Sequence, residues 1–219
     1  MLLLAIDTAT SAVTVAVHDG TRVLAEATTV DSRAHGERLA PGVREVLDRV
    51  GATCADLTDV VCGLGPGPFT GLRVGVVTAR VLAFATGARL RGICSLDALA
   101  ASAGVTGDVL VATDARRKEV YWARYAVSSD AVERLDGPAV TRPAELAAGW
   151  RELPTVGRGP ALYPDLFPRA VGPADGSAAA LADLAVARLA AGDPLAETEP
   201  LYLRRPDAAP WRVAKSALG

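Results

Sequence analysis

The sequence is poor in the side chains that bind metals and form disulfide bonds. Its 219 residues include only two histidines, His18 and His35, and three cysteines. An odd number of cysteines with no C-x-x-C spacing argues against a disulfide framework and against a zinc site. Because the histidines lie 17 positions apart and neither has a cluster of acidic residues around it, we expect no metal site in this chain.

Strong charge of either sign and long hydrophobic runs are also missing. The chain has 23 Lys and Arg against 25 Asp and Glu, a formal net charge of −2. It therefore lacks the broad basic field that neutralises nucleic-acid phosphates, and we do not expect it to be the main reader of an RNA. No apolar run approaches the roughly 18 residues of a membrane span, and the N-terminal MLLLAIDTA has no basic leader. We expect a cytoplasmic protein with no membrane segment.

The two halves of the sequence resemble each other. LLLAIDTATSAVTVAVHDG at 2–20 and VLVATDARRKEVYWARYAV at 109–127 both read as an apolar strand, an Asp, a short polar turn and a second strand. Further along, VCGLGP at 61–66 corresponds to TVGRGP at 155–160. Two matches in the same order indicate an internal duplication. With a third strand and helices between these anchors, each half is predicted to fold as βββαβα.

The duplication predicts an α/β protein of two lobes with a cleft between them. The polar stretch SAGVTGD at 102–108 is the predicted junction, which gives an N-terminal lobe over 1–102 and a C-terminal lobe over 103–219. An Asp that ends the first strand of each lobe, followed by a polar hairpin turn, resembles the layout of the actin-like ATPases, which have a ribonuclease H-like fold. In that fold nucleotide phosphates lie between the two hairpins, so this resemblance predicts a site but not a reaction.

Candidate phosphate-binding residues lie at these strand ends and in the loop GLGPGPFTG, residues 63–71. The loop has neither the G-K-[ST] of a P-loop nor the G-x-G-x-x-G of a dinucleotide site, yet it would present backbone N–H groups at a helix N-terminus. It either binds an anion or only caps the helix. Similarly, the strand-end Asp residues either act on a bound phosphate or cap their own turns. The candidates are Asp7, Thr8, Thr10, Gly65, Gly67, Thr70 and Asp114.

The helix predicted after this loop, residues 70–86, has one face of small side chains. They recur every four positions, at Gly71, Gly75, Ala79 and Ala83. A glycine inside a helix costs about 1 kcal/mol relative to alanine, so two of them indicate the close approach of another backbone. That backbone belongs either to the protein's own sheet or to a partner helix. A second helix, near 36–50, would complete a docking face, and Pro41 is expected to kink it or delay its start.

Five motifs follow one another along most of the chain: AIDTATSAVTVAV, HGERLAP, GLGPGPFTGLRVGV, ATDARRKEVYWARY and PLYLRR. The pattern resembles the TsaB family of bacterial tRNA threonylcarbamoyladenosine biosynthesis proteins. The resemblance implies a non-catalytic scaffold subunit that pairs with its paralogue TsaD. TsaD carries the metal and transfers a threonylcarbamoyl group to the adenosine next to the anticodon of tRNAs that read codons beginning with A. TsaE, a P-loop ATPase, is implied as a further partner.

The resemblance also implies that the two helices of the first lobe form the contact with TsaD. A face that fits a paralogue often fits a second copy of the same chain, so a homodimer is expected when the protein is alone. On this basis Gly71→Arg or Gly75→Arg is expected to break pairing and to leave the fold intact. The interface candidates are His35, Leu39, Gly71, Arg73, Gly75, Ala79 and Ala83.

Neither a catalytic residue nor an intrinsic cofactor is predicted. A TsaD-type metal site needs two histidines four positions apart on a helix, and the corresponding stretch GICSLDALAAS at 92–102 has none. ATP or ADP is expected only at an interface of the complex, and tRNA only through the complex, with the basic segment 201–219 as a candidate contact. The alternative is an independent ATPase or small-molecule kinase, which predicts nucleotide binding by the isolated chain and its loss on Asp7→Ala or Asp114→Ala.

Overall fold

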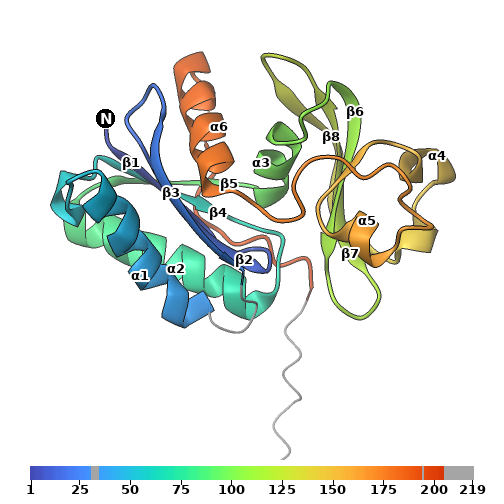
Figure 1. Cartoon of the computed structure of the whole chain (residues 1–219), viewed down its shortest axis with the longest axis horizontal. Coiled ribbons are helices and arrows are strands. Elements are labelled where there is room, and N and C mark those ends of the chain that lie inside the picture. The colour runs from blue at the N-terminus through green and yellow to red at the C-terminus, as the bar shows by residue number, and fades with distance from the viewer. Residues whose placement is uncertain (31–34, 194, 205–219) are drawn as a thin grey trace, which may run out of the picture.

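Two β-sheets with their helices form the molecule (Figure 1). The structure is a computed structural model that describes residues 1–30, 35–193 and 195–204. The elements of the first half are β1 (Leu3–Asp7), β2 (Ala12–His18), β3 (Val23–Val30), α1 (His35–Arg49), η1 (Cys54–Asp56), β4 (Asp59–Gly63), α2 (Phe69–Thr86), β5 (Arg89–Ile93) and α3 (Ser95–Ala101).

The second half of the chain begins again with three strands. Its elements are β6 (Gly107–Asp114), β7 (Val120–Val127), β8 (Val132–Thr141), η2 (Pro143–Glu145), α4 (Ala148–Arg151), β9 (Thr155–Val156), α5 (Gly159–Leu162) and α6 (Ala178–Ala191). Of the basic C-terminal segment considered above, residues 205–219 lie outside the described part of the chain.

The first four strands of the first sheet have the same order and directions as the four strands of the second sheet, as a duplication predicts, and only β5 has no counterpart. The strand order is β3-β2-β1-β4-β5 in the first and β8-β7-β6-β9 in the second. β1 is antiparallel to β2 and parallel to β4, and β6 is likewise antiparallel to β7 and parallel to β9. Asp7 and Asp114 end these two equivalent strands. The predicted two-lobed α/β fold, with duplicated lobes of the actin-like, ribonuclease H-like type, is confirmed.

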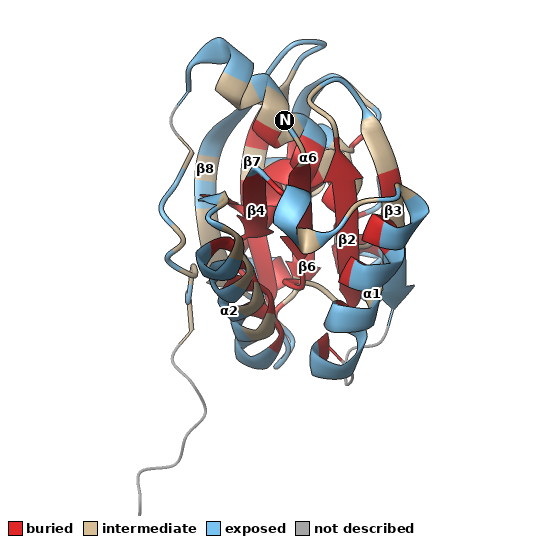
Figure 2. Ribbon diagram, turned by 90° about the vertical axis from the view of Figure 1, so that its left-hand side faces the viewer, coloured by how far each residue is buried: buried red, intermediate tan, exposed pale blue. Residues whose placement is uncertain are grey.

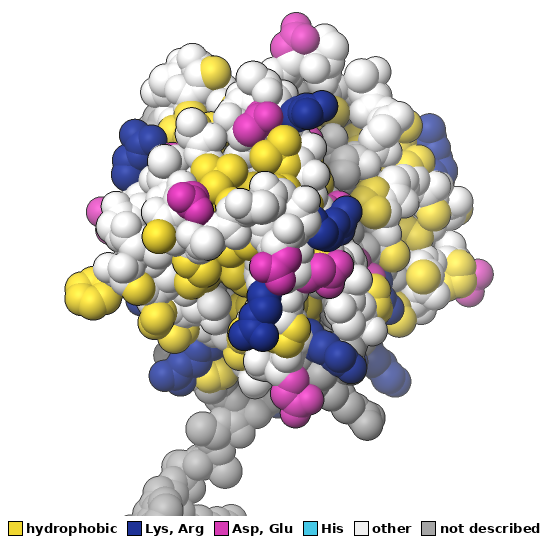
Figure 3. Space-filling view, turned by 60° about the vertical axis from the view of Figure 1, so that its left-hand side comes forward, with side chains coloured by type: hydrophobic (Ala, Val, Ile, Leu, Met, Phe, Trp, Pro, Cys, Tyr) yellow, Lys and Arg dark blue, Asp and Glu magenta, His cyan; other side chains and the backbone are white. Residues whose placement is uncertain are grey.

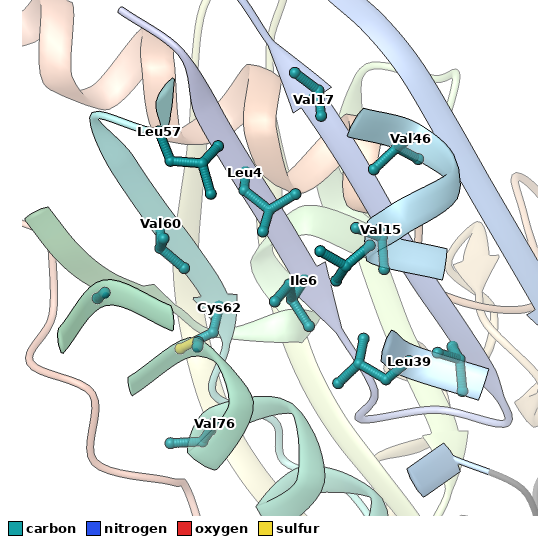
Figure 4. Close-up of a cluster of buried hydrophobic side chains, with 14 of the residues drawn as sticks. Leu4, Ile6, Val15, Val17, Leu39, Val46, Leu57, Val60, Cys62 and Val76 are labelled. Atoms are coloured by element: carbon teal, nitrogen blue, oxygen red, sulfur yellow. The ribbon is translucent and has the colours of Figure 1, made fainter. Parts of the chain in front are cut away.

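Helices cover both faces of the first sheet, which explains why β1 and β2 are buried along their whole length. Leu4 and Ile6 face α1 and α2, whereas Leu3 and Ala5 face α6, and this alternation is the two-residue period of a strand. Figure 4 shows Leu4 and Ile6 among side chains of β2, β4, α1 and α2. In Figure 2 strands β2 and β4 of this sheet are buried, while the outer sides of α1 and α2 are exposed.

Each lobe receives one helix from the other half of the sequence. α6 belongs to the second half, yet its Leu181 and Ala185 pack on the first sheet. α3 belongs to the first half, and its Leu96 and Leu99 pack on the second sheet beside Tyr125. The boundary drawn at residue 102 therefore follows the sheets, but it does not follow the helices.

Most helix ends follow local sequence signals. The Ser177 hydroxyl accepts a hydrogen bond from a first-turn N–H of α6, and Gly192 ends that helix with a φ of 76°, as both residue types predict. α1 begins at His35 and continues through Pro41, so the proline does not delay its start. The structure thus keeps most of the predicted helices.

The βββαβα pattern predicts a helix between β8 and β9, but residues 142–150 do not form one continuous helix. Only the short η2 and α4 form there. Leu146, which lies between them, has an extended backbone and packs into the core of the second lobe with Trp122. Tertiary packing of one side chain overrides the helical pattern at this point.

A buried carboxylate connects the exchanged helices to the second sheet. Asp97, in α3, is 3% exposed. It accepts hydrogen bonds from the Tyr125 hydroxyl at 2.9 Å, from Arg134 Nε at 3.1 Å and from Arg188 at 3.0 Å. These partners lie in β7, β8 and α6, so one side chain joins four elements. Hydrogen bonds between charged groups are about twice as strong as neutral ones.

We expect Asp97→Asn to lower the free energy of unfolding by about 2–4 kcal/mol, because it leaves two partly buried guanidinium groups without their counterion. The measurement is urea-induced unfolding followed by circular dichroism. Asp48→Asn, an exposed carboxylate on α1, is the matched control and should change stability by less than about 0.5 kcal/mol. Equal stability of the two variants would show that the Asp97 cluster does not hold the lobes together.

Candidate functional site

The cleft between the lobes is bordered by the two strand ends that carry Asp7 and Asp114. Asp7 is 2% exposed, and its Oδ1 accepts a hydrogen bond from the Ala9 N–H at 2.8 Å. Asp114 accepts one from the Arg116 N–H, also at 2.8 Å. Each carboxylate therefore bonds the backbone two residues further on, which is the turn-capping arrangement that the sequence left open.

Asp7 is enclosed by protein. Its Oδ2 is buried and has no hydrogen-bond partner among the described residues. Burial raises the pKa of this carboxyl, and the hydrogen bond from the Ala9 N–H opposes that effect only in part. A Cβ on the neighbouring Gly63 would lie 2.4 Å from the Asp7 carboxyl. Asp7 thus packs against β4 and does not project into an open cleft.

The space between the two hairpin turns is small. Thr10, Asp114 and Arg158 line a cavity of about 10 Å³ there, which is room for roughly one water molecule. Arg158 also donates two hydrogen bonds, of 2.8 and 2.6 Å, to the Asp175 carboxylate that lines the same cavity. The Arg158–Asp175 ion pair thus borders the space between the hairpins.

The glycine-proline loop packs on the end of β1. A Cβ on Gly67 would lie 2.3 Å from the carbonyl oxygen of Ala9, and Gly65 has a φ of 84°, a conformation that side chains disfavour. The Thr8 hydroxyl donates a hydrogen bond to the Gly71 carbonyl at 2.8 Å. These contacts join the loop to the chain's own backbone, so its glycines are explained without a ligand.

The remaining phosphate candidates are placed differently. The Thr10 hydroxyl accepts hydrogen bonds from the Ala12 N–H at 3.2 Å and the Gly176 N–H at 3.4 Å. Thr70 is exposed in the first turn of α2. The structure therefore gathers most of the candidates around the end of β1, whereas Thr70 points to the surface and Asp114 lies across the narrow cavity.

The small-residue face of α2 packs inside the protein. A Cβ on Gly71 would lie 2.7 Å from the Thr8 carbonyl oxygen, and one on Gly75 would lie 2.3 Å from the Thr8 hydroxyl oxygen. Ala79 and Ala83 are buried in the same core. The backbone that approaches these glycines is therefore the protein's own sheet. The expectation that Gly71→Arg or Gly75→Arg leaves the fold intact is wrong, because either side chain would displace the end of β1.

Other interface candidates are internal as well. Leu39 is 1% exposed in the core beneath α1, and His35 is buried with its Nε2 3.0 Å from the Thr10 carbonyl oxygen. Of the seven candidates only Arg73 is exposed. The assignment of the interface to the small-residue face is corrected accordingly, because those side chains are covered by their own chain.

The opposite face of α2 carries hydrophobic side chains at the surface. Phe69, Val77, Val81 and Phe84 are 38%, 46%, 59% and 92% exposed, and their spacing places them along one side of the helix. The Arg73 guanidinium lies among them, 5.9 Å from the centre of the Phe69 ring. We refer to these five residues as the α2 stripe. In the sequence, the small residues that recur every four positions gave the stronger signal. The apolar residues that recur at helical spacing on the other side of the helix could have revealed the exposed face.

A groove between α1 and α2 lies beside the α2 stripe. It has a volume of about 370 Å³ and is lined largely by aliphatic side chains, among them Val43, Leu47 and Leu82. In a space-filling view of this side of the molecule, hydrophobic side chains reach the surface between isolated charges (Figure 3). By length and composition alone α2 could cross a membrane, but here it packs on β4 and β1 as a core helix.

Gly75→Ala is expected to lower the free energy of unfolding by about 1–3 kcal/mol, because the added methyl group overlaps the Thr8 hydroxyl and forces a backbone shift. Thermal and urea unfolding measure the change. Gly36→Ala is the matched control, since nothing lies within 4 Å of a Cβ at that helical position, and it should leave stability unchanged or raise it by up to about 1 kcal/mol. Unchanged stability of Gly75→Ala would contradict the close packing of α2 on β1.

The raised pKa of Asp7 makes stability depend on pH. The stabilisation from its protonated form is fully present below the unfolded-state pKa of 3.8 and is lost as pH rises through the folded-state pKa. Asp7→Asn removes the buried charge, so its free energy of unfolding at pH 8 should exceed that of the wild type. The gain should shrink as pH falls towards 4 in urea-unfolding measurements.

Asp19 provides a control of opposite sign for this experiment. Hydrogen bonds from the Thr21 hydroxyl and the Arg22 N–H lower the pKa of its carboxyl, so Asp19→Asn should destabilise the protein at pH 8 and lose that effect in acid. A loss of stability at pH 8 in Asp7→Asn would mean that the ionised Asp7 is required at its site.

Comparison of the sequence with known proteins finds relatives whose names refer to the same tRNA modification. The family model "TsaD: tRNA N6-adenosine threonylcarbamoyltransferase" matches residues 22–196. The tRNA threonylcarbamoyladenosine biosynthesis protein TsaB of Escherichia coli is 35% identical over 175 residues, which cover 76% of this chain and 75% of the relative. An uncharacterized protein of Mycobacterium tuberculosis is 47% identical over 216 residues, which cover 96% and 95% of the two chains.

The solved structures agree with the sequence relatives. YeaZ from Pseudomonas aeruginosa superposes with a TM-score of 0.80 at 32% sequence identity, and the match covers 92% of this chain and 99% of that one. The similarity therefore extends over both lobes and is not confined to one motif. The chain belongs to the TsaB family.

Proposed function

We propose that this chain is a non-catalytic subunit of the complex that forms threonylcarbamoyladenosine in tRNA, and that it binds the catalytic subunit TsaD through the α2 stripe. The pathway is supported by relatives of 35% and 32% identity that are tRNA threonylcarbamoyladenosine biosynthesis proteins. The α2 stripe, an exposed apolar face on a helix whose other face is fully packed, is the observation that supports the binding surface.

The composition of the α2 stripe suits a protein partner. Aromatic residues and arginine are enriched where binding energy concentrates in protein interfaces, and the stripe holds Phe69, Phe84 and Arg73. Phe84 is 92% exposed, an arrangement that costs free energy in water and is relieved by burial against another apolar surface. The adjoining α1–α2 groove extends the same surface and could accept a partner side chain.

A paralogue of the same fold is a fitting occupant. The TsaD family model spans residues 22–196, which include α1 and α2, so TsaD proteins share the region that forms this surface. Two chains of one fold can pair through equivalent surfaces about an approximate twofold axis. On the same argument we propose a homodimer when TsaD is absent. TsaE and tRNA would join the assembled complex.

Several features support a non-catalytic role. Among the described residues no group of three or more His, Cys, Asp or Glu side chains could hold a metal ion. Burial raises the pKa of both Cys62 and Cys94 to about 12, which keeps these thiols protonated and unreactive. The cavity beside Asp114 admits little more than one water. Any ATP or ADP would then bind at a junction between subunits.

Val81→Asp is expected to weaken TsaD binding by at least about 30-fold, the factor that corresponds to a hot-spot loss of 2 kcal/mol. Light scattering of the chain alone and mixed with TsaD gives the assembly state, and titration calorimetry gives the affinity. Leu162→Asp in α5 is the matched control, because Leu162 is 47% exposed in the other lobe and Val81 is 59% exposed. It should bind TsaD as the wild type does.

If Val81→Asp binds TsaD with wild-type affinity, the α2 stripe is not the docking surface. ATP should be titrated into the isolated chain in parallel. Tight ATP binding by a monomer that ignores TsaD would favour the independent ATPase instead.

A further inference from the structure

Residues 195–204 pass from the first lobe to the second and close a hollow beside the glycine-proline loop. The segment pairs with the free edge of β5, and the Leu201 N–H donates a hydrogen bond to the Leu64 carbonyl at 2.8 Å. Arg204 then reaches the β6–β7 hairpin, where its guanidinium donates to the Ala115 carbonyl at 2.8 Å. The wall of the hollow is thus fixed at both ends.

The hollow has the size of a single aromatic ring. Its volume is about 160 Å³, close to the roughly 150 Å³ cavity that takes up benzene in another protein. It is distinct from the cavity between the hairpins, and Pro68 and Arg116 line both spaces. The residues that give it its chemistry are Gly67, Phe69, Arg116, Arg117, Tyr202 and Arg204.

Three arginines and, among the described residues, no carboxylate line this hollow. Arg204 is 21% exposed and its charge is paired with Glu119 behind the wall. Arg116 and Arg117 lie at the hairpin tip, and Arg116 pairs with Asp114 at 3.4 Å outside the hollow. A concave surface lined by charges of one sign attracts ligands of the opposite sign. An anion is favoured here although the whole chain has a net charge of −2.

Two aromatic rings form part of the wall. The ring centres of Phe69 and Tyr202 lie 5.0 Å apart with an interplanar angle of 36°, and Tyr202 is 42% exposed. The Tyr121 hydroxyl donates a hydrogen bond to the Gly67 carbonyl at 3.4 Å, which holds a third ring against the loop. Exposed rings beside arginines are how proteins bind single-stranded nucleotides, because bases stack on the rings and phosphates pair with the guanidinium groups.

We propose that this hollow binds one nucleotide, with its base against Tyr202 and its phosphate on Arg116 and Arg117. The nucleotide is either a free nucleoside monophosphate or one unit of a single-stranded RNA, since both present the same ring and phosphate. The hollow adjoins the α2 stripe, because Phe69 belongs to both. Val81 does not line the hollow, so Val81→Asp should bind the nucleotide as the wild type does.

The test uses the full chain with two probes. AMP is titrated by calorimetry, and a fluorescein-labelled tetra-adenylate RNA is titrated by fluorescence anisotropy at low and at physiological salt. Tyr202→Ala removes the stacking surface, and the double variant Arg116→Gln, Arg117→Gln removes the charges. Arg22→Gln is the matched control, because Arg22 is 79% exposed in the β2–β3 turn of the first lobe. Circular dichroism verifies that each variant is folded.

We expect Tyr202→Ala and the double arginine variant each to weaken binding at least about tenfold, and Arg22→Gln to bind as the wild type. Only the arginine variant should reduce the salt dependence of RNA binding, by about 0.7 in slope for each lost phosphate contact. Binding of AMP identifies a free nucleotide as the ligand, and binding of the RNA alone identifies a strand. The proposal is overturned if the wild type binds neither probe. It is also overturned if Tyr202→Ala binds with wild-type affinity, because binding would then reflect only non-specific charge attraction.

Discussion

The end of β1 is packed into the space left by four glycines, and the arrangement of the first lobe depends on this contact. Gly63, Gly67, Gly71 and Gly75 lie four residues apart, and a Cβ on any of them would come within 2.7 Å of an atom of residues 7–9. The glycines span the end of β4, the following loop and the first turns of α2. Because only a hydrogen atom fits at each position, the loop and the helix are fixed directly against the strand.

This packing affects both the space between the two hairpins and the exposed face of α2. It buries Asp7, and the space between the hairpins holds about one water. It also uses the small-residue face of α2 internally, so the apolar residues on the other face remain at the surface. The first lobe thus keeps its strand-end carboxylate buried and presents an apolar helix face at the surface.

The two lobes are joined by contacts far from the cleft. α3 and α6 each complete the core of the opposite sheet, and Asp97 connects both helices to the second sheet through its arginine and tyrosine partners. Residues 195–204 make a further connection, from β5 to the β6–β7 hairpin. Because these contacts hold the hairpin next to the loop after β4, they also define the arginine-lined hollow between them.

The sequence by itself determined the duplicated α/β fold and the family, because strand periodicity, the repeated strand-Asp-turn pattern and the GPGPFTGLRVG motif are all properties of consecutive residues. Only the tertiary structure decided which face of α2 is buried. In the sequence, the spacing of Gly71 and Gly75 is equally consistent with packing on a partner helix and with packing on the protein's own sheet. The contact with Thr8, which is distant in sequence, shows that they pack on the protein's own sheet. The hollow lined by Phe69, Arg116 and Tyr202 could not be predicted either. Helix and strand preferences act between near neighbours, whereas burial and the meeting of charges with rings are set by long-range packing.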